Sequence, residues 1–172
     1  MTAPTFIPVI ETEHLILREP RLGDFDALCA YFSDARSAFN GGPLDAEGTW
    51  RVLTSASGLW RLRGHGLWFI TRKDDDTFIG FAGIFHAFDW PEPELGYGIA
   101  AGHEGRGVAF EAAMAARQAA ATHFNLTRLP SFIAPDNARS IALAERMGAT
   151  FERKLTLRGD ISHVYRHPQV TP

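Results

Sequence analysis

Apolar side chains recur along this chain with two spacings, which predict strands in some stretches and helices in others. Alternating or continuous apolar runs predict strands over residues 14–18, 67–71, 78–85, 94–100, 128–134, 151–157 and 161–167. Spacing of three and four predicts helices over residues 24–31, 45–63, 109–123 and 137–147, with Asp24 expected to cap the first. The resulting order, β, α, α, β, β, β, α, β, α, β, β, predicts a mixed α/β domain built on one sheet.

Length and composition narrow the class of protein. The chain has 172 residues, of which 45% are hydrophobic, so we expect a single domain over residues 1–172. A net charge of −3 argues against a general nucleic-acid or anionic-membrane binder. No apolar run reaches the roughly 18 residues of a bilayer span, so a soluble cytoplasmic protein is expected. The seven histidines have no ligand spacing, and we expect no metal.

A glycine-broken turn between a predicted strand and a predicted helix is the strongest chemical signal. Gly105 and Gly107 leave the backbone open to an anion, and the first helical turn offers unpaired N–H groups at its positive end. This pattern predicts a phosphate site. Two other interpretations are a plain tight connection and a dinucleotide fingerprint, although Phe110 stands where that fingerprint requires a small residue.

The strand before this turn carries glycines at alternate positions. Gly96 and Gly98 follow Glu94 at intervals of two, so all three side-chain positions share one face of the strand. Glycines so placed predict either a β-bulge or a close approach of another group to the backbone.

The order of elements, the turn from Glu104 to Ala109 and the later pattern Asn137-x-x-Ser140 together resemble the GNAT acyl-CoA N-acyltransferases, most strongly the RimJ/RimL-type branch. The resemblance implies a central, mostly antiparallel mixed sheet that splays between its fourth and fifth strands and is flanked by helices. Glu104 departs from the Gln or Arg that the family usually has at the first position of the phosphate turn.

The resemblance also implies acetyl-CoA as co-substrate. Its pyrophosphate would lie on the turn, and its pantetheine arm would run along residues 98–100 like an extra strand. The implied cofactor-binding residues are Ile99, Gly105, Arg106, Gly107, Val108, Ala109, Phe110, Asn137 and Ser140. Helix capping is the alternative role for Asn137.

Three residues are candidates for the chemistry. Glu94 would accept the proton of the attacking amine, directly or through a water; its alternative role is that of a solvated carboxylate in a turn. The N–H of Ile99 would stabilise the thioester oxygen, as the family implies. Ser140 would donate to the departing sulfur, because Ala144 stands where many relatives have Tyr; alternatively, its hydroxyl would bond the carbonyl of Asp136.

These features predict an N-acetyltransferase that acts on a primary amine, either a protein N-terminus or a small molecule. The alternative is a catalytically weak acyl-CoA-binding or interaction module with the same fold, which the loss of Tyr at Ala144 favours. A homodimer is compatible with either function. Acceptor specificity is expected to lie in the helices around residues 39–60.

Overall fold

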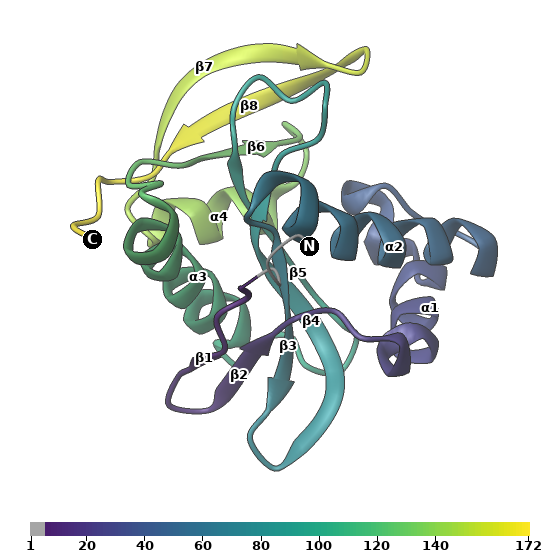
Figure 1. Ribbon diagram of the computed structural model, residues 1–172. Coiled ribbons are helices and arrows are strands. Elements are labelled where there is room, and N and C mark those ends of the chain that lie inside the picture. The colour runs from purple at the N-terminus through teal and green to yellow at the C-terminus, as the bar shows by residue number, and fades with distance from the viewer. Residues whose placement is uncertain (1–5) are drawn as a thin grey trace.

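The computed structural model describes residues 6–172 and contains two antiparallel sheets with helices on both faces (Figure 1). The larger sheet has the order β1-β2-β3-β4-β5 and the smaller has the order β6-β8-β7. The strands are β1 (Ile10–Glu11), β2 (Leu15–Arg18), β3 (Leu67–Arg72), β4 (Asp75–Phe85), β5 (Glu94–Ile99), β6 (Pro130–Ile133), β7 (Thr150–Leu157) and β8 (Asp160–Arg166). The helices are α1 (Phe25–Ser33), α2 (Ala46–Arg63), α3 (Val108–Phe124) and α4 (Ala138–Arg146), with 3-10 turns η1 (Leu22–Asp24) and η2 (Ala35–Asn40).

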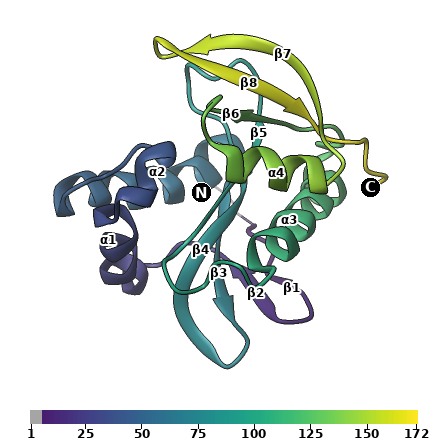
Figure 2. The same ribbon diagram turned by 180° about the vertical axis from the view of Figure 1, so that it is seen from behind.

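The predicted strands and α-helices occur in the predicted order, with one short strand that was not predicted, β1, before them. The splay between the fourth and fifth predicted strands, which are β5 and β6, is confirmed. The expectation of one sheet was wrong, because no backbone ladder joins these two strands. Viewed from behind, the smaller sheet lies across the top of the larger one, beside α4 (Figure 2).

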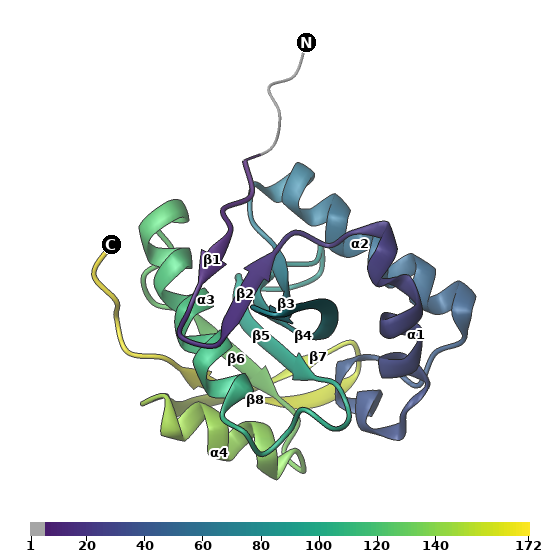
Figure 3. The ribbon, with the colours of Figure 1, turned by 90° about the horizontal axis from the view of Figure 1, so that it is seen from below.

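Strand alternation gives the larger sheet two buried faces. In β3, Trp68 and Ile70 pack toward α3, whereas Phe69 packs toward α1 and α2. The buried face of α3 consists mostly of alanines, which let the helix lie close to the sheet: Ala112, Ala113, Ala116, Ala119 and Ala120. Figure 3 shows α3 on one side of the sheet and α1 with α2 on the other. Within residues 6–172, no helix is long and apolar enough to cross a bilayer.

The predicted bulge in the strand of Gly96 and Gly98 is absent, since the β4–β5 register runs without a shift. A register shift occurs instead in the β3–β4 pair, between Ile70 and Arg72. Close approach is the interpretation that holds for Gly98: a Cβ there would lie 2.5 Å from the hydroxyl of Tyr31 and 2.7 Å from the ring of Phe81.

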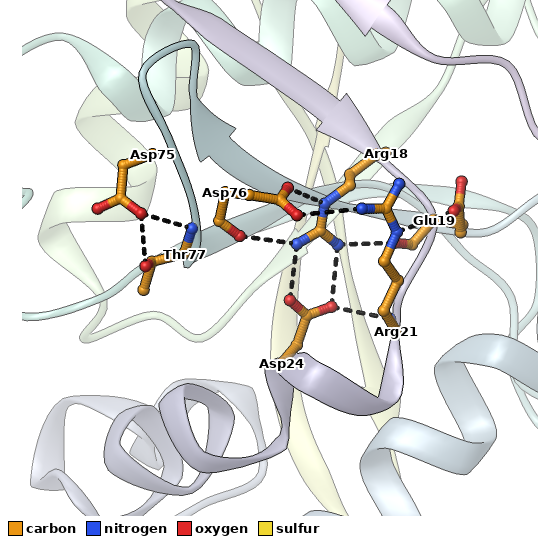
Figure 4. Close-up of polar contacts among 7 residues, drawn as sticks. All are labelled: Arg18, Glu19, Arg21, Asp24, Asp75, Asp76 and Thr77. Carbon is orange, nitrogen blue, oxygen red and sulfur yellow. Dashed lines mark hydrogen bonds and ion pairs between the residues drawn. The ribbon is translucent and has the colours of Figure 1, made fainter.

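A buried arginine fastens α1 to the larger sheet (Figure 4). Arg18 is 3% exposed and uses all five N–H donors: two bond the Asp24 carboxylate, at 2.7 and 3.0 Å, two bond Asp76 and one bonds the carbonyl of Glu19. Asp24 does stand at the N-cap position of α1, but its side chain makes no cap bond to that helix. The expected capping role was wrong because the ion pair with Arg18 and the N–H of Arg21 take both carboxylate oxygens.

We predict that Asp24→Ala lowers the free energy of unfolding by about 3 kcal/mol or more, because it leaves a buried guanidinium without its main partner. Urea unfolding measures the change. The control is Glu19→Ala, which removes a half-exposed pair with Arg21 and should cost less than about 1 kcal/mol. An Asp24→Ala loss no larger than that of the control would contradict the assigned role of the ion pair.

Candidate active site

Side chains, rather than a backbone ladder, span the split between β5 and β6. The Glu94 carboxylate accepts from the N–H of Phe132 at 2.7 Å, which ties the start of β5 to β6. The Ser131 hydroxyl donates to the carbonyl of Leu95, also at 2.7 Å. A cleft of about 1260 Å³ runs along this split and continues toward α1 and α2. The split therefore gives the molecule a deep opening at the centre of its fold.

Glu94 lies buried at the start of β5, with 8% of its surface exposed. It accepts two hydrogen bonds, one from the indole N–H of Trp90 at 2.8 Å and one from the N–H of Phe132. Burial raises the pKa of Glu94 to about 7, and the two donors oppose this rise. The solvated-turn interpretation was wrong, because the carboxyl is enclosed and can exchange a proton near neutral pH.

The face of β5 that carries Glu94 opens toward α1 and α2. Phe85 is the cross-strand partner of Glu94, and Gly83 is that of Gly96. A Cβ on Gly96 would lie 3.8 Å from Leu67 and 3.9 Å from Phe85, which is ordinary contact. The protein around Gly96 therefore has room for a side chain, and its absence enlarges the cleft beside Glu94.

The backbone of Ile99 faces the split. Ala100 donates to the carbonyl of Ile79 across the β4–β5 pair, and bonded and non-bonded pairs alternate along an antiparallel ladder. The pair formed by Gly80 and Ile99 is thus non-bonded, and the N–H of Ile99 points away from β4. The bond from Ser131 to Leu95, four residues earlier on the same edge, agrees with this direction.

The glycine turn is open, as a phosphate site requires. Gly105 and Gly107 have φ of +70° and +78°, and Gly107 directly precedes α3. A Cβ built on either would meet nothing within 4 Å, so positive φ and not crowding explains these glycines. The first intrahelical bond is that from Glu111 to the carbonyl of Gly107, which leaves the N–H groups of residues 108–110 for an anion. The turn therefore fits a pyrophosphate.

Glu104 has partners of its own beside this turn. Its carboxylate pairs with Arg36 of η2 and, at 3.4 Å, with Arg139 at the start of α4. The residue that departs from the family pattern thus connects two elements on opposite sides of the turn.

Asn137 caps α4, since its side chain accepts from the N–H of Ser140 at 3.2 Å. The capping role of Asn137 is confirmed; cofactor binding stays a prediction. Ser140 lines the cleft, and its carbonyl accepts from the hydroxyl of Tyr97 at 3.1 Å. No bond from the Ser140 hydroxyl to the carbonyl of Asp136 is present among residues 6–172, so the alternative role of Ser140 has no support.

Sequence reasoning missed the network that holds Leu95. Ser131 also contacts Nε2 of His167 at 2.9 Å, and Nδ1 of His167 lies 3.4 Å from Arg117. Since Arg117 can only donate, Nδ1 accepts and the Nε2 proton goes to Ser131, which in turn donates to Leu95. Burial lowers the pKa of His167 to about 4, so the ring is neutral at pH 7. No local pattern marks these residues, because two strands, a helix and the segment after β8 supply them.

Trp90 was also missed as a partner of Glu94. Its indole packs edge-to-face against Phe85 at 5.0 Å, and the guanidinium of Arg158 lies 4.8 Å from its ring centre. Arg158, in the β7–β8 turn, forms two bonds to Asp89, at 2.7 and 2.8 Å. Arg158, in the turn between β7 and β8, thus packs on Trp90, the residue that donates a hydrogen bond to Glu94.

Residues 14–150 match a family model described as an acetyltransferase (GNAT) domain. The chain belongs to the GNAT acetyltransferase family. An acetyltransferase structure from Agrobacterium tumefaciens is similar at 38% identity, with a TM-score of 0.86 over 98% of this chain and 99% of that one. The protein named Uncharacterized N-acetyltransferase p20, from Bacillus licheniformis, is 32% identical over 152 residues, which cover 86% of this chain and 84% of p20.

The RimL ribosomal L7/L12 alpha-N-protein acetyltransferase, solved in complex with coenzyme A, has the same fold at 18% identity. Its TM-score is 0.75, and the match covers 95% of this chain and 98% of RimL. The predicted GNAT N-acetyltransferase family and fold are thereby confirmed. Among the described residues, no three His, Cys, Asp or Glu side chains gather as a metal site would require.

We predict that Trp90→Phe raises the pKa of Glu94 above its present value of about 7, because the variant loses a donor to the carboxylate and keeps the burial. Carboxyl ¹³C NMR titration of Glu94 measures the pKa. Trp50→Phe, on α2 and packed against Phe25, is the control and should leave the value unchanged. An unchanged pKa in Trp90→Phe would show that the indole does not set it.

Proposed function

We propose that this protein transfers the acetyl group of acetyl-CoA to a primary amine by direct attack of the amine on the thioester. The observation that carries the proposal is the position of Glu94. It is a buried cleft carboxyl with a pKa of about 7, at the start of the strand whose far end directs the N–H of Ile99 away from β4, toward the split. The complex of RimL with coenzyme A supports the choice of co-substrate.

Acetyl-CoA would enter along the split. Its pyrophosphate would bind the backbone amides of Gly105, Arg106, Gly107, Val108, Ala109 and Phe110, at the positive end of α3. The amide-bearing pantetheine arm would pair with the free edge of β5, as an added strand does. Asn137 would contact the arm through its side-chain amide, because its Oδ1 is already used in capping α4.

The reaction requires a neutral amine. At pH 7 deprotonation costs about 4.6 kcal/mol for a lysine amine of pKa about 10.4, but about 1.1 kcal/mol for an α-amine of pKa about 7.8. A carboxylate with a pKa near 7 suits the second task. The protonated amine would first pass one proton to Glu94, directly or through a water. The neutral nitrogen would then form the new C–N bond, and the second proton it loses would go to the departing sulfur.

The thioester carbon–sulfur bond then breaks. The N–H of Ile99 would stabilise the negative charge that develops on the carbonyl oxygen. The thiolate leaves with a conjugate-acid pKa of about 8.5, so a weak donor suffices. Ser140 would supply it, since Ala144 cannot. The Tyr97 hydroxyl, from β5, reaches the same turn of α4 and donates to the Ser140 carbonyl, and burial keeps it protonated by raising its pKa.

The experiment that tests this function follows release of free thiol from acetyl-CoA in the presence of α-amino acid amides. Release that depends on the acceptor supports the enzyme. Tight binding of CoA without turnover on any acceptor supports the alternative, an acyl-CoA-binding module.

Glu94→Gln should lower turnover by about 10²- to 10⁴-fold at pH 8 and leave acetyl-CoA affinity nearly unchanged. The ratio of the wild-type rate to the variant rate should fall as the pH drops below about 7, because Glu94 is then protonated. Both enzymes are measured with the same acceptor amine, so its own titration affects both rates equally and does not change the ratio. Glu13→Gln is the control, because the Glu13 side chain is 84% exposed and does not line the cleft. Equal turnover of Glu94→Gln and wild type at every pH would remove Glu94 from the mechanism.

A further inference from the structure

The part of the cleft between Glu94 and the helices α1 and α2 is walled by aromatic and aliphatic side chains. They come from helix α1, from strands β3 and β4 and from the β4–β5 loop: Phe32, Leu67, Phe81, Phe85, Phe88 and Trp90. Phe88 is 91% exposed, so an occupant of the cleft would cover apolar surface that now faces solvent.

Carboxylates outnumber arginines among the residues that line the cleft. Of the two arginines that line the cleft, Arg158 is held by two bonds to Asp89, and Arg51 lies at the rim with 76% of its side chain exposed, paired with Glu47. Three carboxylates line the cleft: Glu94, which is buried, and Asp136 and Asp160, which are exposed as Arg51 is. The carboxylates attract a cationic amine. Both arginines already pair with carboxylates, so neither offers a free cation to an anionic group beside that amine.

The floor of this space is Gly96, two residues from Glu94 on the same face of β5. A Cβ there would contact Leu67 and Phe85 at 3.8 and 3.9 Å without displacing either. Alanine would thus fit in this strand without a clash, and glycine leaves the space beside the carboxyl to a ligand.

We infer that the acceptor is a primary amine whose amine-bearing carbon carries an apolar group of aromatic size and no anionic group, and that Gly96 determines this specificity. The inference rests on the proposed function. A ring in this space would remove apolar surface of both partners from water, and the protonated amine would arrive beside the Glu94 carboxyl that then deprotonates it. The same chemistry is offered by an aromatic N-terminal residue of a peptide and by a small alkyl amine that carries an aromatic ring.

The experiment compares kcat/KM for three amides with similar α-amine pKa values: phenylalaninamide, alaninamide and the α-amide of glutamic acid. We expect phenylalaninamide to exceed alaninamide by about 10- to 100-fold and the glutamic acid amide to be the poorest acceptor. A peptide amide that begins with Phe is the fourth acceptor, and its rate relative to phenylalaninamide assigns the amine to a protein N-terminus or to a small molecule. Either assignment agrees with the inference.

Gly96→Val tests the floor directly, since Val suits an extended strand and its branches would fill the space. The ratio of phenylalaninamide to alaninamide kcat/KM should fall at least tenfold, with a smaller fall of the same sign in Gly96→Ala. Gly23→Ala is the control: a Cβ there meets nothing within 4 Å, and Gly23 lies in η1, outside the cleft. Thermal unfolding confirms that each variant is folded.

Two results would overturn the inference while leaving the proposed function intact. One is transfer with equal or reversed preference among the three amides. The other is an unchanged preference in folded Gly96→Ala and Gly96→Val. Absence of transfer to every amine tested would overturn the proposed function itself, and this inference with it.

Discussion

The break between β5 and β6 is the constraint on which the rest of this structure depends. Strands that lie side by side normally satisfy their backbone groups with each other, but here no ladder joins them. Two side-chain bonds cross the gap instead, Glu94 to Phe132 and Ser131 to Leu95, and a third, Tyr97 to Ser140, joins β5 to α4. The gap is therefore fixed in width yet leaves backbone donors on its edge available, which is what a ligand rich in amides requires.

The same bonds connect the architecture to the proposed chemistry. Glu94 is both a bridge between the sheets and the candidate base, and its carboxyl gains its raised pKa from the burial that bridging imposes. Its neighbour Leu95 is held through Ser131 by the neutral ring of His167. Away from this edge of the larger sheet, the buried pair of Arg18 on β2 and Asp24 fixes α1, a wall of the space where the acceptor would lie. Both walls of the cleft thus depend on buried polar groups that are fully paired.

Local sequence patterns were enough to predict most of the fold and part of the site. Periodicity gave the order of elements, and the glycines at 105 and 107 marked the turn before α3, because positive φ requires them. Glu94 was found through its place at the start of a strand, its spacing from two glycines and the resemblance to the RimJ/RimL-type branch. The sequence could not give its donors, since Trp90 reaches it around a loop and Phe132 reaches it from another sheet. The partner of Asp24 was hidden for the same reason: a helix cap is a local pattern, whereas an ion pair with a preceding strand is not.

The most direct test of this account is a crystal structure with a stable acetyl-CoA analogue in which a methylene replaces the thioester sulfur. The account predicts the pyrophosphate on the amides of residues 105–110, the pantetheine arm beside β5, and the acyl carbonyl oxygen about 2.7–3.2 Å from the N–H of Ile99. Glu94 would face the acyl carbon from the side of α1 and α2. An analogue bound outside the split, or one whose carbonyl takes its hydrogen bond elsewhere while Ile99 pairs with another group, would contradict it.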